Sequence, residues 1–407
     1  MSTSQCDVAI IGGGHNGLVA GNYLVRRGHR VIVIEAAPAL GGMTTSGHFF
    51  PEAPEHVMHP CAVDVIMMNA TTIERDLCLG QYGYRTVRPD PSYAHVHPDG
   101  TVVAFWNDPR RTVENIRRFS PQDASAYLEF AELLTTLSSI AGPGMNLQMS
   151  RPDPGTLMKA VRGVFRGRKR LREIVGFATA TALQVVDERF THPAVRSALM
   201  GMAASAGSVD KPGSSLAFLL LGFLHTTGIT RPVGGMAALT GALAKSFTAH
   251  GGQISTGVAV EEVHLSGTAV RGVRLEDGRS IGARAVLSTA DPHTTLISLL
   301  PEGILDRATT ARVEHIPANG DGVSPFKVDL ALSSRVTVPG HTLDGVDLRV
   351  PVLMLGTVEE VVDSFTVAAR GRFRTIRRCG CASRPGPIPP RRPQARTAST
   401  CTRLPCR

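Results

Sequence analysis

The chain has 407 residues, of which 43% are hydrophobic and 19% charged, and this composition excludes a chain that is disordered throughout. Its 42 glycines show no fixed period, which excludes a collagen-like fold. The formal net charge of +9 would favour an anionic partner, but eleven Arg and no acidic residue fall within residues 370–407. Residues 1–369 hold 32 Lys and Arg against 34 Asp and Glu, so we predict no nucleic-acid partner for the body of the chain.

Cysteine usage and apolar runs favour a cytoplasmic location. Only Cys6, Cys61 and Cys78 lie in the body, and three scattered cysteines form no disulfide framework. The first residues are polar and lead directly into a strand, so we expect no signal peptide. The longest apolar run, Leu216–Leu224, has nine residues, whereas a membrane-spanning helix needs ~20.

The N-terminal segment has the pattern of a βαβ unit. Val8–Ile11 is a short apolar strand, and a glycine-rich turn follows it. Leu18–Arg27 has helical spacing and ends at Gly28, and Val31–Ile34 is a second, β-branched strand. This order predicts two parallel strands joined by a helix.

Farther along the chain the hydrophobic period changes twice. We expect short strands near Ala94–His97 and Val102–Phe105, then mostly helices over residues 109–225. One of these helices begins with Ser120 as N-cap and Pro121 at its first position. From Gly251 onward the hydrophobic period is that of strands. We expect one strand through Val258, Val260, Val263 and Leu265, and a second through Val270, Val273 and Leu275. A turn at Asp277-Gly278 and a short buried strand over Ala285–Ser288 should follow.

The turn after the first strand carries the pattern G-x-G-x-x-G. Gly12 allows a tight turn, Gly14 lets a pyrophosphate approach the backbone, and Gly17 lets the following helix pack closely on the sheet. The free N–H groups at the helix N-terminus, where His15 and Asn16 stand, would face the phosphates. Because the pattern follows a strand and opens a helix, it predicts a dinucleotide site.

Two further features favour FAD as the dinucleotide. Glu35 ends the second strand, 18 residues after Gly17, and its carboxylate would bind ribose hydroxyls and repel a 2′-phosphate, which argues against NADP. The pair Gly41-Gly42 would bring a second loop over the same pyrophosphate, which NAD-dependent dehydrogenases do not generally need. The chain has no second G-x-G-x-x-G and no C-x-x-C, which disfavours a disulfide reductase.

These segments resemble the phytoene desaturase and carotenoid oxidoreductase family of FAD-dependent enzymes. A second block is also similar: Pro232–Met236, Leu239, Ala242-Leu243, Gly251-Gly252, Ile254, Val258–Val263, Gly272-Val273, Asp277-Gly278 and Val286–Ser288. The resemblance runs from about Gln5 to about Gly371.

The resemblance implies an α/β fold with a Rossmann-type FAD-binding domain of the GR2-like kind and an inserted mixed α+β substrate domain. It places the FAD-binding segments at 1–105 and 226–300, a mainly helical substrate segment at 106–225, and an incomplete second substrate segment at 301–369. By analogy Val260 would meet the adenine through its backbone, and Ala290 would lie near the cofactor. The predicted cofactor-binding residues are Gly12, Gly14, His15, Asn16, Gly17, Glu35, Ala36, Gly41, Gly42, Met43, Thr44, Val260 and Ala290. The sequence names no catalytic residue and no metal ligand.

The C-terminal residues 370–407 do not resemble the family. They hold eleven Arg, six Pro and four Cys, and few residues from the set Val, Ile, Leu, Phe and Met, among them Phe373, Ile376 and Leu404. We expect this tail to be disordered and to be translated out of frame, in place of the glycine-rich flavin motif that ends family members.

Two other groups of residues leave alternatives open. His56, His59 and Cys61 could bind a metal, but we favour loop or pocket residues because a fourth ligand is missing. Residues 159–172 carry seven basic side chains among apolar ones, which is typical either of a solvated basic face or of a peripheral membrane contact.

For function, the sequence predicts an FAD-dependent oxidoreductase of the desaturase or dehydrogenase type. It would take a hydride from a hydrophobic substrate, of which isoprenoids and carotenoids are examples, onto flavin N5. A flavin amine oxidase is the alternative enzyme, although Met43 stands where those enzymes usually have Arg. A non-catalytic remnant without the flavin motif is the alternative outside catalysis.

Overall fold

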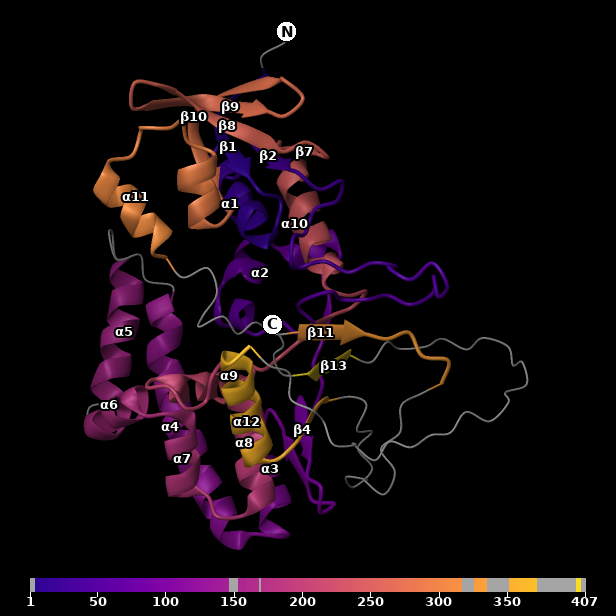
Figure 1. Cartoon of the computed structure of the whole chain (residues 1–407), viewed down its shortest axis with the longest axis vertical. Coiled ribbons are helices and arrows are strands. Elements are labelled where there is room, and N and C mark those ends of the chain that lie inside the picture. The colour runs from indigo at the N-terminus through magenta and orange to yellow at the C-terminus, as the bar shows by residue number, and fades with distance from the viewer. Residues whose placement is uncertain are drawn as a thin grey trace.

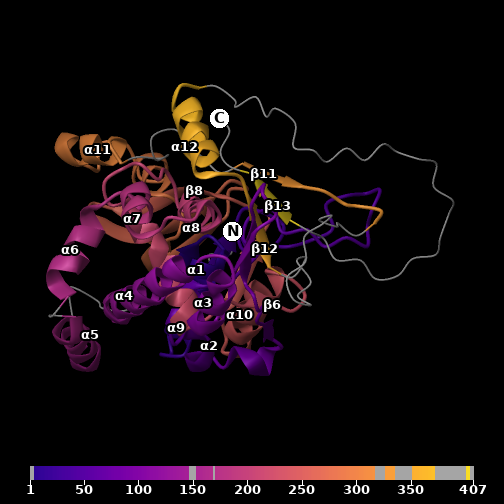
Figure 2. The same ribbon diagram turned by 90° about the horizontal axis from the view of Figure 1, so that it is seen from below.

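The computed structural model describes residues 4–145, 153–167, 170–316, 326–334, 351–371 and 400–403. A six-stranded sheet forms one end of the molecule, and a helical part with a small sheet forms the other (Figure 1). Figure 2 shows the same ribbon turned by 90° and seen from below.

The six-stranded sheet combines strands from distant parts of the sequence. Its order is β7-β2-β1-β10-β9-β8. The strands β7, β2, β1 and β10 run parallel, whereas β9 is antiparallel to both β10 and β8. Their bounds are β1 Ser4–Ile11, β2 Val31–Glu35, β7 Gln253–Thr256, β8 Val260–Ser266, β9 Ala269–Leu275 and β10 Ser280–Ser288. The sheet therefore joins strands of the two predicted FAD-binding segments, while the predicted domain boundaries themselves stay predictions.

Alternating side chains of β1 and β2 are buried on opposite faces of this sheet. Ile10 and Val33 belong to one buried cluster together with Phe247. That face is covered by α1 (His15–Val25) and α10 (Ala237–Ala249). Ile11 and Ile34 belong to a second cluster, with the β8–β9 hairpin. Burial on both faces explains the continuous apolar run of these strands and confirms the predicted Rossmann-type α/β fold.

The helical part packs around one large buried core. Its helices are α3 Pro109–Arg117, α4 Pro121–Met145, α5 Pro154–Gly167, α6 Leu171–Thr179, α7 Ala182–Arg189, α8 Pro193–Ala204, α9 Leu219–Thr226 and α12 Val358–Ala369, with the 3₁₀ helix η4 Ser214–Phe218. Phe130, Phe190 and Phe218 meet in the core with their rings edge to face. Ser120 Oγ accepts a hydrogen bond from the N–H of Asp123, as expected of an N-cap.

A three-stranded sheet, β12-β4-β5, lies beside these helices. Its strands are β4 Tyr93–Val96, β5 Val102–Phe105 and β12 Val352–Leu355. β12 pairs parallel to β4, so residues near 352 join the same part of the molecule as residues near 94. The remaining elements are η1 Met67–Ala70, α2 Ile73–Asp76, η2 Leu79–Tyr82, β3 Thr86–Val87, β6 Arg231–Pro232, the π-helix η5 Thr294–Ser298, α11 Arg307–Glu314, β11 Phe326–Asp329 and β13 Thr400–Arg403.

Two expectations need correction. The strand predicted as short and buried over Ala285–Ser288 begins at Ser280, and Ala285 is exposed, because no described segment covers its side chain. Within the tail predicted to be disordered, Thr400–Arg403 forms a strand, because the edge of β11 offers free backbone groups for pairing. Residues 372–399 and 404–407 lie outside the described residues.

Candidate cofactor site

The glycine-rich turn connects β1 directly to α1. Gly12 has φ +100°, which only glycine adopts without strain. Its N–H donates to the carbonyl oxygen of Ile34, 2.8 Å away, so the turn is tied to the end of β2. A Cβ built on Gly17 would lie 2.1 Å from the carbonyl oxygen of Gly12. Both glycines therefore have the roles in chain geometry that the motif predicts.

The second glycine pair lies against the first turn. The N–H of Gly41 donates to the carbonyl oxygen of Gly13 at 3.0 Å, and Gly14 and Gly41 form an isolated parallel bridge. A Cβ on Gly42 would lie 3.6 Å from the Cα of Gly14. The spacing Gly41-Gly42 thus brings a second loop to the N-terminus of α1.

The space at Gly14 fits a phosphate group. A Cβ on this residue would meet no described atom nearer than the carbonyl oxygen of Gly41, at 3.8 Å. Gly14 is the N-cap of α1, and no side chain caps the first N–H groups of that helix. Uncapped N–H groups and the helix dipole attract an anion, so the residues present fit the pyrophosphate of a dinucleotide.

The carboxylate of Glu35 holds two turns in place. Its Oε2 accepts the N–H of Gly13 at 2.8 Å, and its Oε1 accepts the N–H of Ala37 at 2.9 Å. Each carboxylate oxygen can accept a second hydrogen bond, so these contacts leave capacity for ribose hydroxyls. Binding of a ribose by Glu35 stays a prediction. The backbone contacts of Glu35 are a role that sequence reasoning missed.

His15 and Thr44 connect α1 to the second glycine loop. The Nδ1 atom of His15 lies 2.9 Å from Oγ1 of Thr44, and the N–H of Thr44 donates to the carbonyl oxygen of Gly41. Loss of solvent around the imidazole lowers the pKa of His15, which favours its neutral form. Thr44 is buried. His15 is exposed, as are the predicted residues Asn16, Ala36 and Met43.

The two residues predicted from the later block lie at different edges of this site. The N–H of Gly257 donates to the carbonyl oxygens of Glu35 and Ala37, and Val260 begins β8 three residues later. Ala290 is the second residue after β10 and follows Thr289, whose hydroxyl donates to the carbonyl oxygens of Ile11 and Gly12. The structure therefore brings both chain segments to the loops around Glu35 and Gly12.

Thr289 is a positioning residue that sequence reasoning missed. Its Oγ1 donates to the carbonyl oxygen of Ile11 at 3.0 Å, and its N–H donates to the same oxygen at 2.9 Å. A Cβ on Gly12 would lie 2.4 Å from this hydroxyl oxygen. In the sequence, only its position directly after the expected strand at Ala285–Ser288, which could pair with β1, could have indicated this role.

The loop with the two histidines lies beside the segment before α10. Ser46 Oγ accepts the N–H of Ala237 at 3.0 Å. A Cβ on Gly235 would come within 2.6 Å of both Ser46 Oγ and His59 Cε1. Among the described residues, no group of three or more His, Cys, Asp or Glu side chains is arranged to hold a metal ion.

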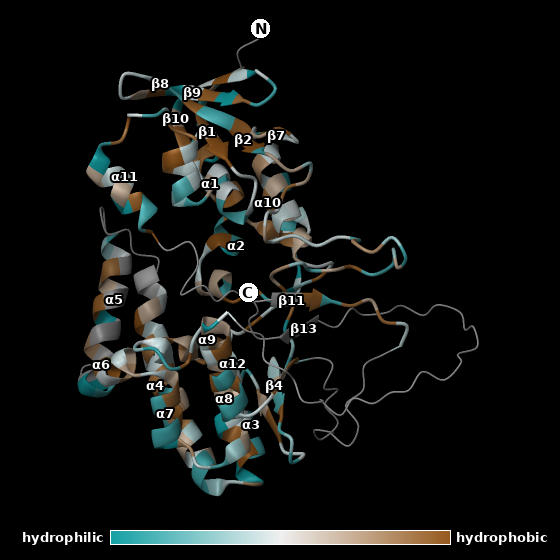
Figure 3. Ribbon diagram, in the orientation of Figure 1, coloured by the Kyte–Doolittle hydropathy of each residue, from teal (hydrophilic) through white to brown (hydrophobic). Residues whose placement is uncertain are grey.

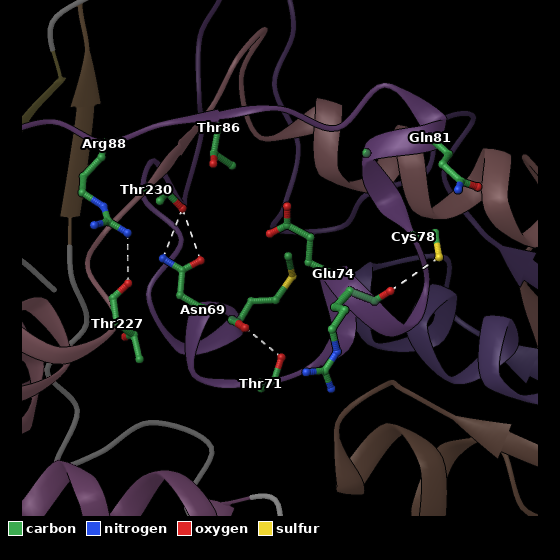
Figure 4. A pocket seen from close by; sticks show the side chains of 12 residues that line it. Asn69, Thr71, Glu74, Cys78, Gln81, Thr86, Arg88, Thr227 and Thr230 are labelled. Carbon is green, nitrogen blue, oxygen red and sulfur yellow. Dashed lines mark hydrogen bonds between the residues drawn. The ribbon is translucent and has the colours of Figure 1, made fainter.

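A separate pocket of about 690 Å³ is lined by parts of η1, α2, η2 and β3, together with Thr227 and Thr230 before β6 (Figure 4). Its lining combines polar and apolar side chains. Asn69 donates to Thr230 Oγ1 at 3.2 Å, and Arg88 donates to the carbonyl oxygen of Thr227 at 3.3 Å. None of the predicted cofactor-binding residues is among the described residues that line it, so this pocket is not the cofactor site.

No helix among the described residues has both the length and the apolar character needed to cross a lipid bilayer.

Comparison with known proteins identifies relatives of several activities. The chain is 27% identical over 356 residues to the rat protein called pyridine nucleotide-disulfide oxidoreductase domain-containing protein 2, covering 81% of this chain and 60% of the relative. It is 28% identical to a limonene dehydrogenase polypeptide of Castellaniella defragrans, covering 73% and 54%. It is 25% identical to the lycopene-forming phytoene desaturase of Pseudescherichia vulneris, covering 75% and 60%. The chain thus spans about 60% or less of the length of these relatives.

A solved structure and a family model agree with this relationship. An oxidoreductase from Methanosarcina mazei has a TM-score of 0.52 and 14% identity, covering 76% of this chain and 64% of that chain, which shows a shared fold. The model of the flavin-containing amine oxidoreductases matches residues 17–352. The family model, with the desaturase relative, confirms the predicted phytoene desaturase-like group and its flavin cofactor. The chain belongs to the flavin-containing amine oxidoreductase family.

Proposed function

We propose that this protein is an FAD-dependent oxidoreductase of the desaturase or dehydrogenase type. The observation that carries the proposal is the meeting of two glycine loops, at Gly14 and Gly41, over the uncapped N-terminus of α1. Glu35 stands beside them at the end of β2, where a ribose would lie. Bound FAD would supply flavin N5 as the acceptor of a hydride.

The residues of this chain would hold the cofactor at its phosphate and adenosine end. The N–H groups of the first turn of α1 would bind the pyrophosphate, and Gly14 would leave room for it. The turn is held from both sides of β1. Thr289, after β10, donates to Ile11, and Glu35, at the end of β2, accepts the N–H of Gly13. A pre-organised turn loses little entropy on binding, which favours tight retention of the dinucleotide.

For the substrate we propose a hydrophobic molecule of the isoprenoid class. The proposal rests on two relatives whose names refer to isoprenoid hydrocarbons, limonene and phytoene. A flavin amine oxidase is the second candidate, because the family model carries that activity in its description.

The proposal is tested on the full chain purified after expression with riboflavin. We expect a yellow protein with a flavin spectrum that dithionite bleaches. Under anaerobic conditions, a detergent-dispersed isoprenoid hydrocarbon should bleach the bound flavin, whereas an alkyl amine should not. Bleaching by the amine alone would replace the desaturase proposal with the amine oxidase one. Colourless protein that fails to take up added FAD would overturn both in favour of the non-catalytic remnant.

A further inference from the structure

The outer face of α5 exposes a row of large apolar side chains. Leu157, Met158 and Val161 are 41%, 52% and 53% exposed, and Phe165 is 61% exposed. The spacings of one, four and eight residues from Leu157 place them along one stripe of the helix. Single exposed apolar residues are ordinary, but a continuous row at helical spacing marks an interaction surface.

This row lies at the edge of the molecule. α5 packs along α4, and α6, which follows it, exposes Val175. In both views α5 and α6 form an outer side of the helical part, away from β4 in Figure 1 and from β12 in Figure 2. Figure 3 shows that α5 is not uniformly polar, although it lies at this edge. A flat partner could therefore reach the row without meeting the six-stranded sheet.

The same segment concentrates positive charge. Residues 154–172 contain seven Lys and Arg and no acidic residue. Without those seven, residues 1–369 hold 25 Lys and Arg against 34 Asp and Glu. The segment is therefore positively charged, whereas the rest of residues 1–369 carries a net negative charge. Arg162 and Arg172 are exposed and form no ion pair within the described residues, whereas Arg170 is paired with Glu173 at 2.6 Å. Asp153 and Glu173 bracket the segment.

We propose that the α5–α6 surface, defined by Leu157, Met158, Val161, Arg162 and Arg172, binds the surface of an anionic lipid bilayer. An apolar stripe flanked by Arg and Lys is the pattern of a helix that lies in the membrane interface. The stripe inserts between headgroups, while each basic side chain near the surface gains from anionic lipid. A nucleic acid would use the charge alone, because its backbone offers no apolar phase to the stripe. The proposal goes beyond the proposed function and does not depend on it.

Vesicle co-sedimentation of the full chain tests the proposal. The vesicles contain phosphatidylcholine alone or phosphatidylcholine with phosphatidylglycerol, and the same vesicles are used for every variant. Met158→Ser/Val161→Ser removes apolar contacts without changing charge, and Arg162→Glu/Arg172→Glu reverses charge without changing the stripe. Leu355→Ser/Arg110→Glu is the matched control, because both residues are exposed and lie outside α5 and α6. Residues 370–407, with their eleven Arg, are identical in all variants, so differences between variants report on the α5–α6 surface.

We expect binding to anionic vesicles only, with a several-fold loss in each variant of the α5–α6 surface and no change in the control. Circular dichroism and a thermal melt establish that each variant is folded. Equal vesicle binding by the parent protein, the two surface variants and the control would overturn the proposal, because another part of the chain would then bind the lipid. Binding of a short DNA duplex in place of vesicles, lost with Arg162→Glu/Arg172→Glu, would overturn it in favour of nucleic acid. A change from oligomer to monomer in Met158→Ser/Val161→Ser, without vesicle binding by the parent, would overturn it in favour of self-association.

Discussion

Gly17 packs so closely on Gly12 that a Cβ at position 17 would lie 2.1 Å from the Gly12 carbonyl oxygen. The contact is between two backbones, so no rotation of a side chain can relieve it. Gly14 differs from both, because a Cβ there would meet only an ordinary contact at 3.8 Å. Glycines of one motif therefore differ in role: Gly12 and Gly17 make the fold, and Gly14 borders the open space in which we propose that the cofactor binds.

The first prediction separates these purposes. Gly17→Ala should destabilise the fold by about 2 kcal/mol or more, because the helix must move away from the turn. Gly14→Ala should leave the melting temperature of the apoprotein nearly unchanged and weaken FAD binding at least tenfold. Thermal melts and FAD titrations of both variants measure the difference. Gly241→Ala on α10, where a Cβ meets no described atom within 4 Å, is the control for a harmless added methyl group.

A second prediction concerns Glu35. Glu35→Gln replaces one acceptor oxygen with an NH₂ group that would face the N–H of Gly13 or Ala37. Loss of one charge-assisted hydrogen bond should cost about 1–3 kcal/mol of unfolding free energy. FAD affinity should fall with it, because the turn that faces the phosphates is less ordered. Urea unfolding and flavin retention on a desalting column measure the two effects, and an unchanged unfolding curve would remove the structural role assigned to this carboxylate.

A third prediction tests Thr289, which contacts the backbone of the glycine-rich turn at Ile11 and Gly12. Thr289→Val removes the hydroxyl that donates to Ile11 and keeps the volume of the side chain, whereas Thr289→Ser keeps the hydroxyl. We expect Thr289→Val to cost about 1 kcal/mol of stability and to raise the Kd for FAD several-fold. Thr289→Ser should restore most of the affinity. Equal FAD binding by both variants would show that the strand end does not order the turn.

A fourth prediction follows from His95 in β4, which is fully buried. Burial, with a smaller effect from His97, lowers the pKa of His95 from 6.5 to about 4. Between these values the unfolded chain binds a proton that the folded chain does not, so stability falls as the pH falls through this window. At about pH 5 the loss from this group should be about 2 kcal/mol relative to neutral pH.

The contribution of His95 to acid sensitivity is measured by urea unfolding of the parent protein and of His95→Leu, each near pH 7 and near pH 5. The variant cannot take up the proton, so its stability should change less between the two pH values. If parent and variant lost the same stability on acidification, titration of His95 would not contribute to acid sensitivity.

Local sequence patterns determined much of this structure. The run Val31–Ile34 is apolar at every position because both faces of β2 are covered, and the turn at Gly12 needs a positive φ. Both features depend on neighbours in the chain and on periodicity, which a sequence displays directly. The helix N-cap at Ser120 is predictable for the same reason.

Contacts between distant residues required the tertiary structure. Thr289 binds Ile11 across 278 positions of sequence, and only the order of strands in the sheet places β10 next to β1. The exposure of Met158 and Val161 likewise depends on which face of α5 meets α4, which helical spacing alone does not determine. The sequence by itself thus determined the cofactor motif and the βαβ unit, because these are local. The fixing of that motif by a distant strand, and the apolar surface of α5, were decided by packing.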